Sequence, residues 1–223
     1  MNQKMTSRSP QRQVVTNFSA SNLAGSDLGG VTAHKGQFNG SALHGSDFSG
    51  ADLTGSSFKG SDVRNANFDG ANLTNCSFLA LDLSKASFNK SILVRTNFNS
   101  SQLDGAKFTG VRLTDVMLTT TDLRTTVFAG CLFDGVDFKY SDLSGQRFDG
   151  QTFIGVKFDR AALSHASFRG ATLKNVSFHP GFTLTKKYYR SIKTICFDGA
   201  TMDKLTYAAL KGMEADLSKV TVI

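Results

Sequence analysis

Paired cysteines are missing from the sequence. Its three cysteines, Cys76, Cys131 and Cys196, lie far apart in a chain of 223 residues, and no CxxC motif occurs. A disulfide framework or a structural zinc site requires cysteines at short, repeated spacings, so neither is expected. We therefore expect a reducing compartment, and we interpret Cys76 and Cys131 as buried packing residues rather than reactive thiols.

Long apolar segments are also missing. The first basic residues are followed only by Val14 and Val15, and nowhere do 18 apolar residues follow one another. A secretory signal and a membrane-spanning helix both need such a run. We therefore expect a soluble, cytoplasmic protein without a membrane span.

The residue types that carry catalysis are not grouped. The four histidines, His34, His44, His165 and His179, are scattered, and they form no triad or metal-ligand spacing with other residues. The glycine-rich segment 29–36 lacks the Gly-Lys-Ser/Thr ending of a phosphate-binding loop. The sequence therefore predicts no catalytic residues, no cofactor and no metal, and a protein that is not an enzyme.

The formal net charge of +7 is concentrated at the two ends of the chain. Residues 1–15 contain three bases and no acid, and residues 179–223 contain seven Lys/Arg against four acids. Residues 16–178 contain 15 Lys/Arg and 14 Asp, so the main body is almost neutral. The charge therefore does not mark the body as a nucleic-acid binder.

A five-residue repeat is the dominant feature that the sequence does contain. Phe or Leu occupies the positions ending in 3 or 8 from Phe18 to Phe178, in 33 consecutive units without a change of phase. Only Ala33 and Val63 depart from this rule. Self-similarity at a fixed period is the signature of a solenoid.

A second inward position precedes each apolar centre by two residues. It is usually small, with Leu81, Gln146 and Gln151 as exceptions. If the 29 charges of residues 16–178 were placed indifferently, about a dozen would fall on these two positions, where burial of an unpaired charge is costly. None does, so both positions are predicted to face the interior.

A period of five matches neither an α-helix nor a β-strand. It fits a square coil in which each pentapeptide forms one side and one corner, and four complete a coil of 20 residues. Counted from Phe18, sides one and three carry mostly Phe and sides two and four mostly Leu, which fills the interior. The predicted core is Phe18, Phe38, Phe48, Phe58, Phe68, Phe78, Phe88, Phe98, Phe108, Phe128, Phe138, Phe148, Phe158, Phe168, Phe178, Leu23, Leu43, Leu53, Leu73, Leu83, Leu103, Leu123, Leu143 and Leu163.

Units such as ADLTG at 51–55 and ANLTN at 71–75 resemble the A(D/N)LxX consensus of the bacterial pentapeptide-repeat family. The resemblance covers roughly three quarters of the chain. It implies a right-handed quadrilateral β-helix whose coils stack through backbone hydrogen bonds. The predicted fold is thus an all-β solenoid of about eight coils with a small α-helical C-terminal cap.

Three segments follow from this organisation. Residues 1–15 are polar and are predicted to be a disordered tail. Residues 16–178 form the predicted β-helix, which ends at the His-Pro-Gly break of residues 179–181. Residues 179–223 are predicted to be a capping module of two short helices and an imperfect last coil, because the open end of a solenoid needs a cover.

Three surfaces are candidate partner sites, although a solvated and locally balanced surface is the alternative for each. An acidic ladder is expected on side two: Asp62, Asp82, Asp104, Asp122 and Asp142. Exposed apolar residues are expected on side four: Ile92, Val94, Leu132 and Ile154. A basic face is expected on the first C-terminal helix: Lys186, Lys187, Arg190 and Lys193.

A filled solenoid with flat walls lacks the concave pocket of an enzyme. The leading hypothesis is therefore a non-enzymatic binding or scaffold protein with an unknown protein partner, and homodimerisation through a solenoid end is a second expectation. The resemblance implies an alternative, since some family members protect DNA gyrase or topoisomerase IV by imitating DNA. DNA carries a charge every ~1.7 Å, so the nearly neutral body disfavours this alternative. A secreted bacterial effector with residues 1–15 as its export tag is a further alternative.

Overall fold

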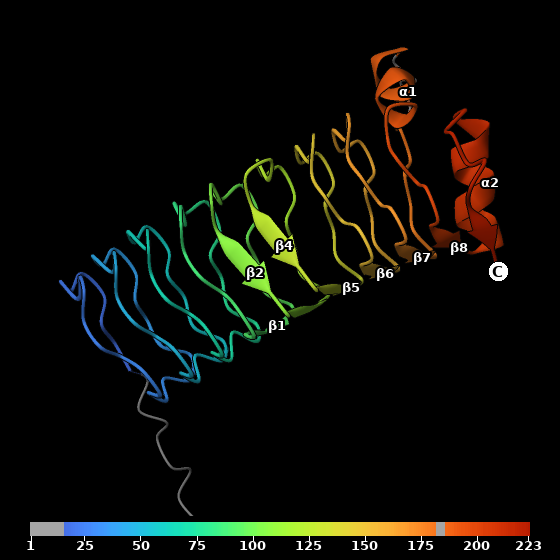
Figure 1. Ribbon diagram of the computed structural model, residues 1–223. Helices are drawn as coiled ribbons and strands as arrows, with labels where there is room; N and C mark the ends of the chain where they lie inside the picture. Colours follow the sequence, from blue (N-terminus) through green and yellow to red (C-terminus); the bar gives the residue numbers. More distant parts are fainter. Residues whose placement is uncertain (1–15, 182–185) are drawn as a thin grey trace, which may run out of the picture.

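The repeating body of the protein is a right-handed, four-sided β-helix. The computed structural model describes residues 16–181 and 186–223. Residues 20 positions apart pair in parallel, as Asn17 does with Gln37 and Gln37 with Ser57, so residues 16–175 wind into eight stacked coils (Figure 1). Two predictions, the disordered tail and the export tag at residues 1–15, lie outside the described residues.

Each side of the coil contributes only about three extended residues before the chain turns, so the strands are short. A seven-stranded parallel sheet runs along side four, in the order β1 (Ile92–Val94), β3 (Arg112–Thr114), β5 (Leu132–Asp134), β6 (Thr152–Ile154), β7 (Thr172–Lys174), β8 (Thr201–Met202) and β9 (Thr221–Val222). A two-stranded sheet on side three joins β2 (Lys107–Thr109) and β4 (Val127–Ala129). Isolated bridges connect the remaining sides from coil to coil.

The corners share one backbone conformation. The fifth residue of every unit from Ala20 to Asn175 has a positive φ, with Thr125 as the one exception. Glycine adopts this conformation without strain, but lysine, arginine and even the β-branched Thr120 (φ 56°) hold it here. The stacked coils therefore impose the corner geometry, and glycine facilitates it.

The core is a pair of phenylalanine columns. Along side one Phe38, Phe58 and Phe78 stack nearly parallel, with ring centroids 4.9 and 4.8 Å apart. Side-three rings meet them edge to face, as Phe68 meets Phe58 at 87°. Both geometries are favourable for aromatic rings, so the columns stabilise each other.

Burial follows the inward positions, with a departure at the N-terminal end. From the second coil onward every predicted core residue is buried, at 5% exposure or less. Phe18 and Leu23, which were predicted to be core, are only half-buried. They lie in the first coil of the described residues.

Polar residues at the small inward position are satisfied within the wall. The Thr96 hydroxyl and the Cys76 thiol each donate to the carbonyl of the centre residue 23 positions earlier, at 2.9 Å in both cases. The two glutamines that broke the small-residue rule do the same. Gln146 donates to the carbonyls of Leu123 and Thr126, so its larger amide links two coils.

The C-terminal segment replaces missing sides of the ninth and tenth coils. Helix α1 (Lys186–Ile192) takes the place of a side-two strand, after which Cys196 pairs with Ser167 and the coil resumes. Helix α2 (Lys204–Gly212) then covers the last side-one strand (Figure 1). Ile192 and Leu210 join the core from the two helices.

Candidate functional site

Side four carries an exposed group of apolar residues that we call the wall patch: Ile92, Val94, Leu132 and Ile154. The register aligns Ile92 with Arg112 and Leu132 in one column, and Val94 with Thr114, Asp134 and Ile154 in the next. Ile92 is 51% and Ile154 38% exposed, while Val94 and Leu132 are half-buried. The patch therefore lies on β1, β5 and β6, and β3, between β1 and β5, contributes Arg112 and Thr114.

The charges within the wall patch neutralise each other. Arg112 donates from Nη2 to Asp134 Oδ2 at 2.8 Å. The stem of an arginine is itself apolar, so Arg112 continues the apolar surface between Ile92 and Leu132. The wall patch is thus apolar overall and without net charge.

Other exposed apolar side chains in the described part of the chain are more isolated. Leu79 and Met117 lie on side one in non-adjacent coils, and Val127 lies on side three beside polar neighbours. Single apolar residues of this kind are common on protein surfaces. On side four, by contrast, Leu132 and Ile154 occupy the adjacent strands β5 and β6.

The acidic ladder of side two is bridged by arginine. Arg64 binds both carboxylate oxygens of Asp62, at 2.8 and 2.6 Å, and its Nε lies 4.0 Å from Asp82. The hydrogen bonds and charge of Arg64 lower the pKa of Asp62 despite partial burial. His44 Nδ1 lies 3.5 Å from the same carboxylate. This end of the ladder is consequently an ion-pair network.

The bridge recurs three coils further along side two. Arg124 lies 2.6 Å from Asp122 and 3.6 Å from Asp142, and it lowers the pKa of Asp122. Between the bridges, Asp104 accepts a hydrogen bond from the Thr125 hydroxyl. Four of the five carboxylates therefore lie within 4.0 Å of an arginine nitrogen, which leaves a face with less net negative charge than its aspartates suggest.

The basic face belongs to α1. Lys186 and Arg190 are exposed, and Lys193, one residue beyond the helix, pairs with Glu214. The side chain of Lys187 lies outside the described positions. Tyr188, on the opposite side, donates its hydroxyl to the carbonyl of Phe178, and burial raises its pKa. The aromatic side of α1 thus faces the solenoid.

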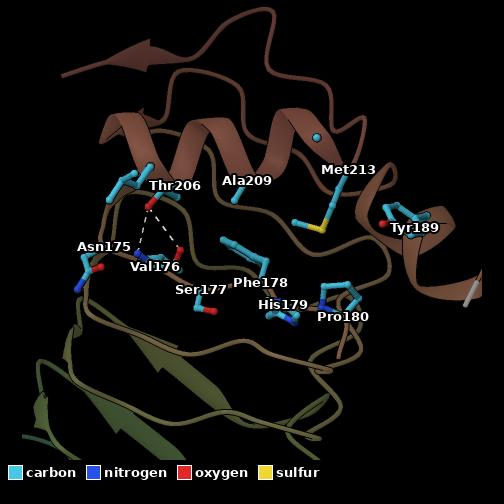
Figure 2. Close-up of a pocket in the computed structure, with 12 residues that line it drawn as sticks. Asn175, Val176, Ser177, Phe178, His179, Pro180, Tyr189, Thr206, Ala209 and Met213 are labelled. Carbon is cyan, nitrogen blue, oxygen red and sulfur yellow. Dashed lines mark hydrogen bonds between the residues drawn. The ribbon is translucent and has the colours of Figure 1, made fainter. Parts of the chain in front are cut away.

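A hollow that the sequence pattern did not predict lies between the last coil and α2. Its volume is about 460 Å³, and Val176, Phe178, Ala209 and Met213 line it (Figure 2). The Thr206 hydroxyl bonds the backbone of Val176 at one end. The other end is bounded by His179, Pro180 and Tyr189, a mostly apolar set. We call this space the cap hollow.

One stripe of α2 faces the cap hollow. Its residues recur at a helical spacing, which the five-residue repeat of the sequence obscures. Leu205, Ala209 and Met213 recur every four residues beside the buried pair Thr206 and Leu210. Leu205 is 77% exposed at the mouth. The spacing of these residues is the sequence signal that could have indicated the cap hollow. The cavity itself is formed only by the contact of α2 with Phe178. The hollow has the size of a small-ligand site and few polar groups to orient a substrate.

Nucleophilic and metal-binding chemistry finds little support in the described residues. No group of three or more His, Cys, Asp or Glu that could hold a metal ion occurs among them. Burial raises the pKa of the Cys76 thiol to about 12 and that of Cys131 above its usual range, so both favour the unreactive thiol. Among the helices described, none is long and apolar enough to cross a membrane.

Comparison with known proteins gives one family. The model of the "Pentapeptide repeat region" matches residues 31–108 and 106–178, which together span well over half of the chain. No curated protein matches the sequence significantly.

Solved structures show similar folds. HetL, a pentapeptide repeat protein involved in heterocyst differentiation regulation in the cyanobacterium Nostoc sp. PCC 7120, is 18% identical with a TM-score of 0.59, over 83% of this chain and 86% of its own. QnrB1, a plasmid-mediated fluoroquinolone resistance protein, is 22% identical with a TM-score of 0.45, over 88% and 96%. A thylakoid-lumen protein of Arabidopsis thaliana is 33% identical with a TM-score of 0.33, over 45% and 66%. At these identities HetL supports the fold alone.

Proposed function

Since the chain belongs to the pentapeptide repeat family, we propose that it is a non-enzymatic binding protein that docks a protein partner on the wall patch. A rigid rod with a filled interior presents surfaces rather than pockets, and its walls are preorganised for contact. We also propose that the protein acts as a scaffold and is located in the cytoplasm.

The observation that carries the proposal is the wall patch itself, with Ile92 and Val94 on β1, Leu132 on β5 and Ile154 on β6 of one sheet. Apolar side chains gathered on a flat sheet mark interaction sites. The Arg112–Asp134 pair leaves the patch neutral, so a partner with a flat apolar surface fits it better than a polyanion.

The size of the wall sets the strength of the contact. Seven strands at ~4.8 Å spacing make a sheet roughly 30 Å long. A five-residue side is at most about 17 Å wide. The wall therefore offers less than roughly 500 Å², compared with about 800 Å² per partner in a standard stable interface. A reversible complex, with a Kd on the order of micromolar, is the expected outcome.

A photocrosslinking amino acid at position 92 tests the proposal. The full chain with this label should capture a discrete protein in its native cells, and the same label at Leu79 is the matched control. Leu79 is a similarly exposed apolar residue (47%, against 51% for Ile92), but it lies on another wall. With the captured protein purified, Ile92→Glu combined with Ile154→Glu should weaken binding at least tenfold, and Leu79→Glu should not.

Three results would overturn the proposal: capture from neither position, equal capture from position 79, or equal affinity of the wall variant. Capture of a second copy, supported by dimers in sedimentation equilibrium, would also replace the proposed partner with self-association. The glutamate variants place charge on exposed positions, so circular dichroism should show an unchanged fold.

Protection of a type II topoisomerase by DNA mimicry is the alternative function, and the arginine bridges weigh against it. A mimic needs unpaired negative charge at close spacing, whereas Arg64 and Arg124 each lie within 4.0 Å of two carboxylates. A supercoiling assay with gyrase, with and without a quinolone, separates the functions. An effect at micromolar protein that Arg64→Glu strengthens would favour mimicry.

A further inference from the structure

Positive charge accumulates at the C-terminal end of the rod. Residues 16–138 contain nine Lys/Arg against 11 Asp, whereas residues 139–223 contain thirteen Lys/Arg against seven acids. The two halves of the solenoid therefore differ in sign, and the basic end includes α1. A polyanion would be attracted to this end and not to the remainder of the rod.

An arginine–tyrosine platform lies at one edge of the basic end. Arg160 Nη1 donates to the Tyr140 hydroxyl at 2.7 Å, and the guanidinium carbon lies 5.3 Å from the Tyr140 ring centroid. Gly181 closes over the guanidinium so tightly that a Cβ there would lie 2.0 Å from Arg160 Nε. Tyr140 nevertheless remains 56% exposed. An aromatic ring is thus held rigidly in place, open to solvent, beside a positive charge.

A basic hollow lies at the next corner of the same coil. Arg147 and Arg169 line it together with His165, and its volume is about 400 Å³. Arg169 Nε donates to Cys196 Sγ at 3.1 Å, which orients its guanidinium. Arg147 binds Asp149 at 3.0 Å and is largely exposed.

Helix α1 lies between the platform and this hollow. Its side-two position is fixed by the hydrogen bonds from Tyr188 to Phe178 and from the backbone of His165 to Thr194. Residue 160 belongs to the platform and residue 165 to the basic hollow. These corner residues are five positions apart, so the platform and the basic hollow are separated by at most about 17 Å. Lys186 and Arg190 of α1, which takes the side-two position between these corners, are exposed. The three features form one surface.

We propose that this surface, consisting of Tyr140, Arg160, α1, Arg147 and Arg169, binds single-stranded nucleic acid. Basic groups attract the phosphates, and the exposed Tyr140 ring offers a stacking face for an unpaired base. The nearby carboxylates Asp149 and Asp159 are each bound by a serine hydroxyl and a backbone N–H. Charge alone would fit a lipid headgroup or an acidic protein as well, but the exposed ring beside the charge adds the stacking face that an unpaired base uses.

Fluorescence anisotropy with labelled U or dT oligomers of about 12 nucleotides tests the proposal on the full chain. Binding should weaken steeply between about 50 and 200 mM salt. Arg160→Gln combined with Arg169→Gln should reduce affinity at least tenfold and flatten the salt dependence. The charge-matched control, Lys35→Gln combined with Lys59→Gln in the N-terminal coils, should leave affinity within twofold.

The tyrosine separates stacking from simple charge attraction. Tyr140→Ala should lower affinity about tenfold, while Tyr140→Phe, which keeps the ring, should retain most of it. An unaffected Tyr140→Ala variant would overturn the proposal, as would equal binding to polyglutamate. Binding to phosphatidylserine vesicles without binding to oligonucleotides would assign the surface to membranes instead. Binding that none of these variants alters would place it elsewhere, for example on the three bases of residues 1–15.

Discussion

The repeating body and the C-terminal cap cover their neighbours by different means. In the body each coil presents the same backbone groups to the next, so the Phe38 N–H donates to the Ser57 carbonyl and most other centre residues donate to the residue 19 positions later. In the cap, side chains take over this task. Asp203 and Thr206 accept the N–H groups of Asn175 and Val176, which have no further coil above them.

This difference explains why the two regions depend on sequence differently. A body residue is one of many equivalents, and its role follows from its position in the five-residue period. A cap residue such as Asp203 has no equivalent, because one side chain also begins α2 by accepting from Leu205 and Thr206. The fold of the body therefore depends little on any single residue, except that a charge in its core is not tolerated. The cap depends instead on a few polar contacts.

The largest effect is expected in the body core. Phe88→Asp should abolish folding, because the ring is fully buried between Phe68 and Phe108 and a carboxylate there has no partner. Circular dichroism and chemical denaturation provide the measurement. Phe18→Asp is the matched control at a half-buried position in the first coil, and it should retain a cooperative transition. Cooperative unfolding of the Phe88 variant would refute the inward register.

Thiol labelling should distinguish the regions next. At pH 8 a disulfide reagent should react with Cys196, which is half-exposed, far faster than with Cys76 or Cys131. Burial blocks access to Cys76 and raises its pKa to about 12, so few thiolates form. The two slow thiols should react only as the body unfolds in denaturant. Cys196→Ser should remove the fast phase, and its persistence would contradict the assignment.

A smaller effect is expected in the cap. Asp203→Ala should destabilise α2 by about 2 kcal/mol, because it removes an N-cap and leaves the Asn175 N–H unpaired. Hydrogen exchange should quicken at Leu210 and remain slow at Leu103 in the body. Asp216→Ala is the control, since Asp216 accepts only from Ser218. Equal exchange in both variants would show that the contacts of Asp203 do not hold the cap.

Lowering the pH tests the hydrogen bonds of Asp203 in the unmodified protein. Burial opposes ionisation of Asp203, but hydrogen bonds from Thr206 and three backbone N–H groups outweigh it and lower its pKa below the ordinary 3.8. A depressed carboxyl pKa contributes stability above the ordinary value, and this contribution is lost as the pH falls through the lowered one. The protection factors of cap amides, corrected for the intrinsic pH dependence of exchange, should accordingly fall below about pH 4 in the wild type, with a weaker dependence in Asp203→Ala.

Periodicity was sufficient to predict the fold class because it reports burial directly. The Phe and Leu centres repeat every five residues, and charge never occupies their positions, so the square coil followed from counting. The same rule marked Gln146 and Gln151 only as exceptions. Their amides bond carbonyls 23 residues earlier, a distance in sequence that becomes a neighbour only once the coil is closed.

The candidate sites were less predictable because they depend on side-chain direction. The acidic ladder was visible in the sequence, but only geometry shows that Arg64 and Arg124 each span two coils. The cap hollow and the Tyr140–Arg160 platform combine residues from separate coils with Gly181 or α2. No local sequence pattern predicts such pairs, because they do not recur from coil to coil.

The 20-residue coil makes the molecule a ruler. An inserted or deleted segment leaves every later residue on its own side only when it contains a whole coil, and each coil changes the length by ~4.8 Å. The separation between the wall patch and the basic end is therefore quantised. Two molecules held at these two places would be kept at a distance that the chain can adjust only in discrete steps.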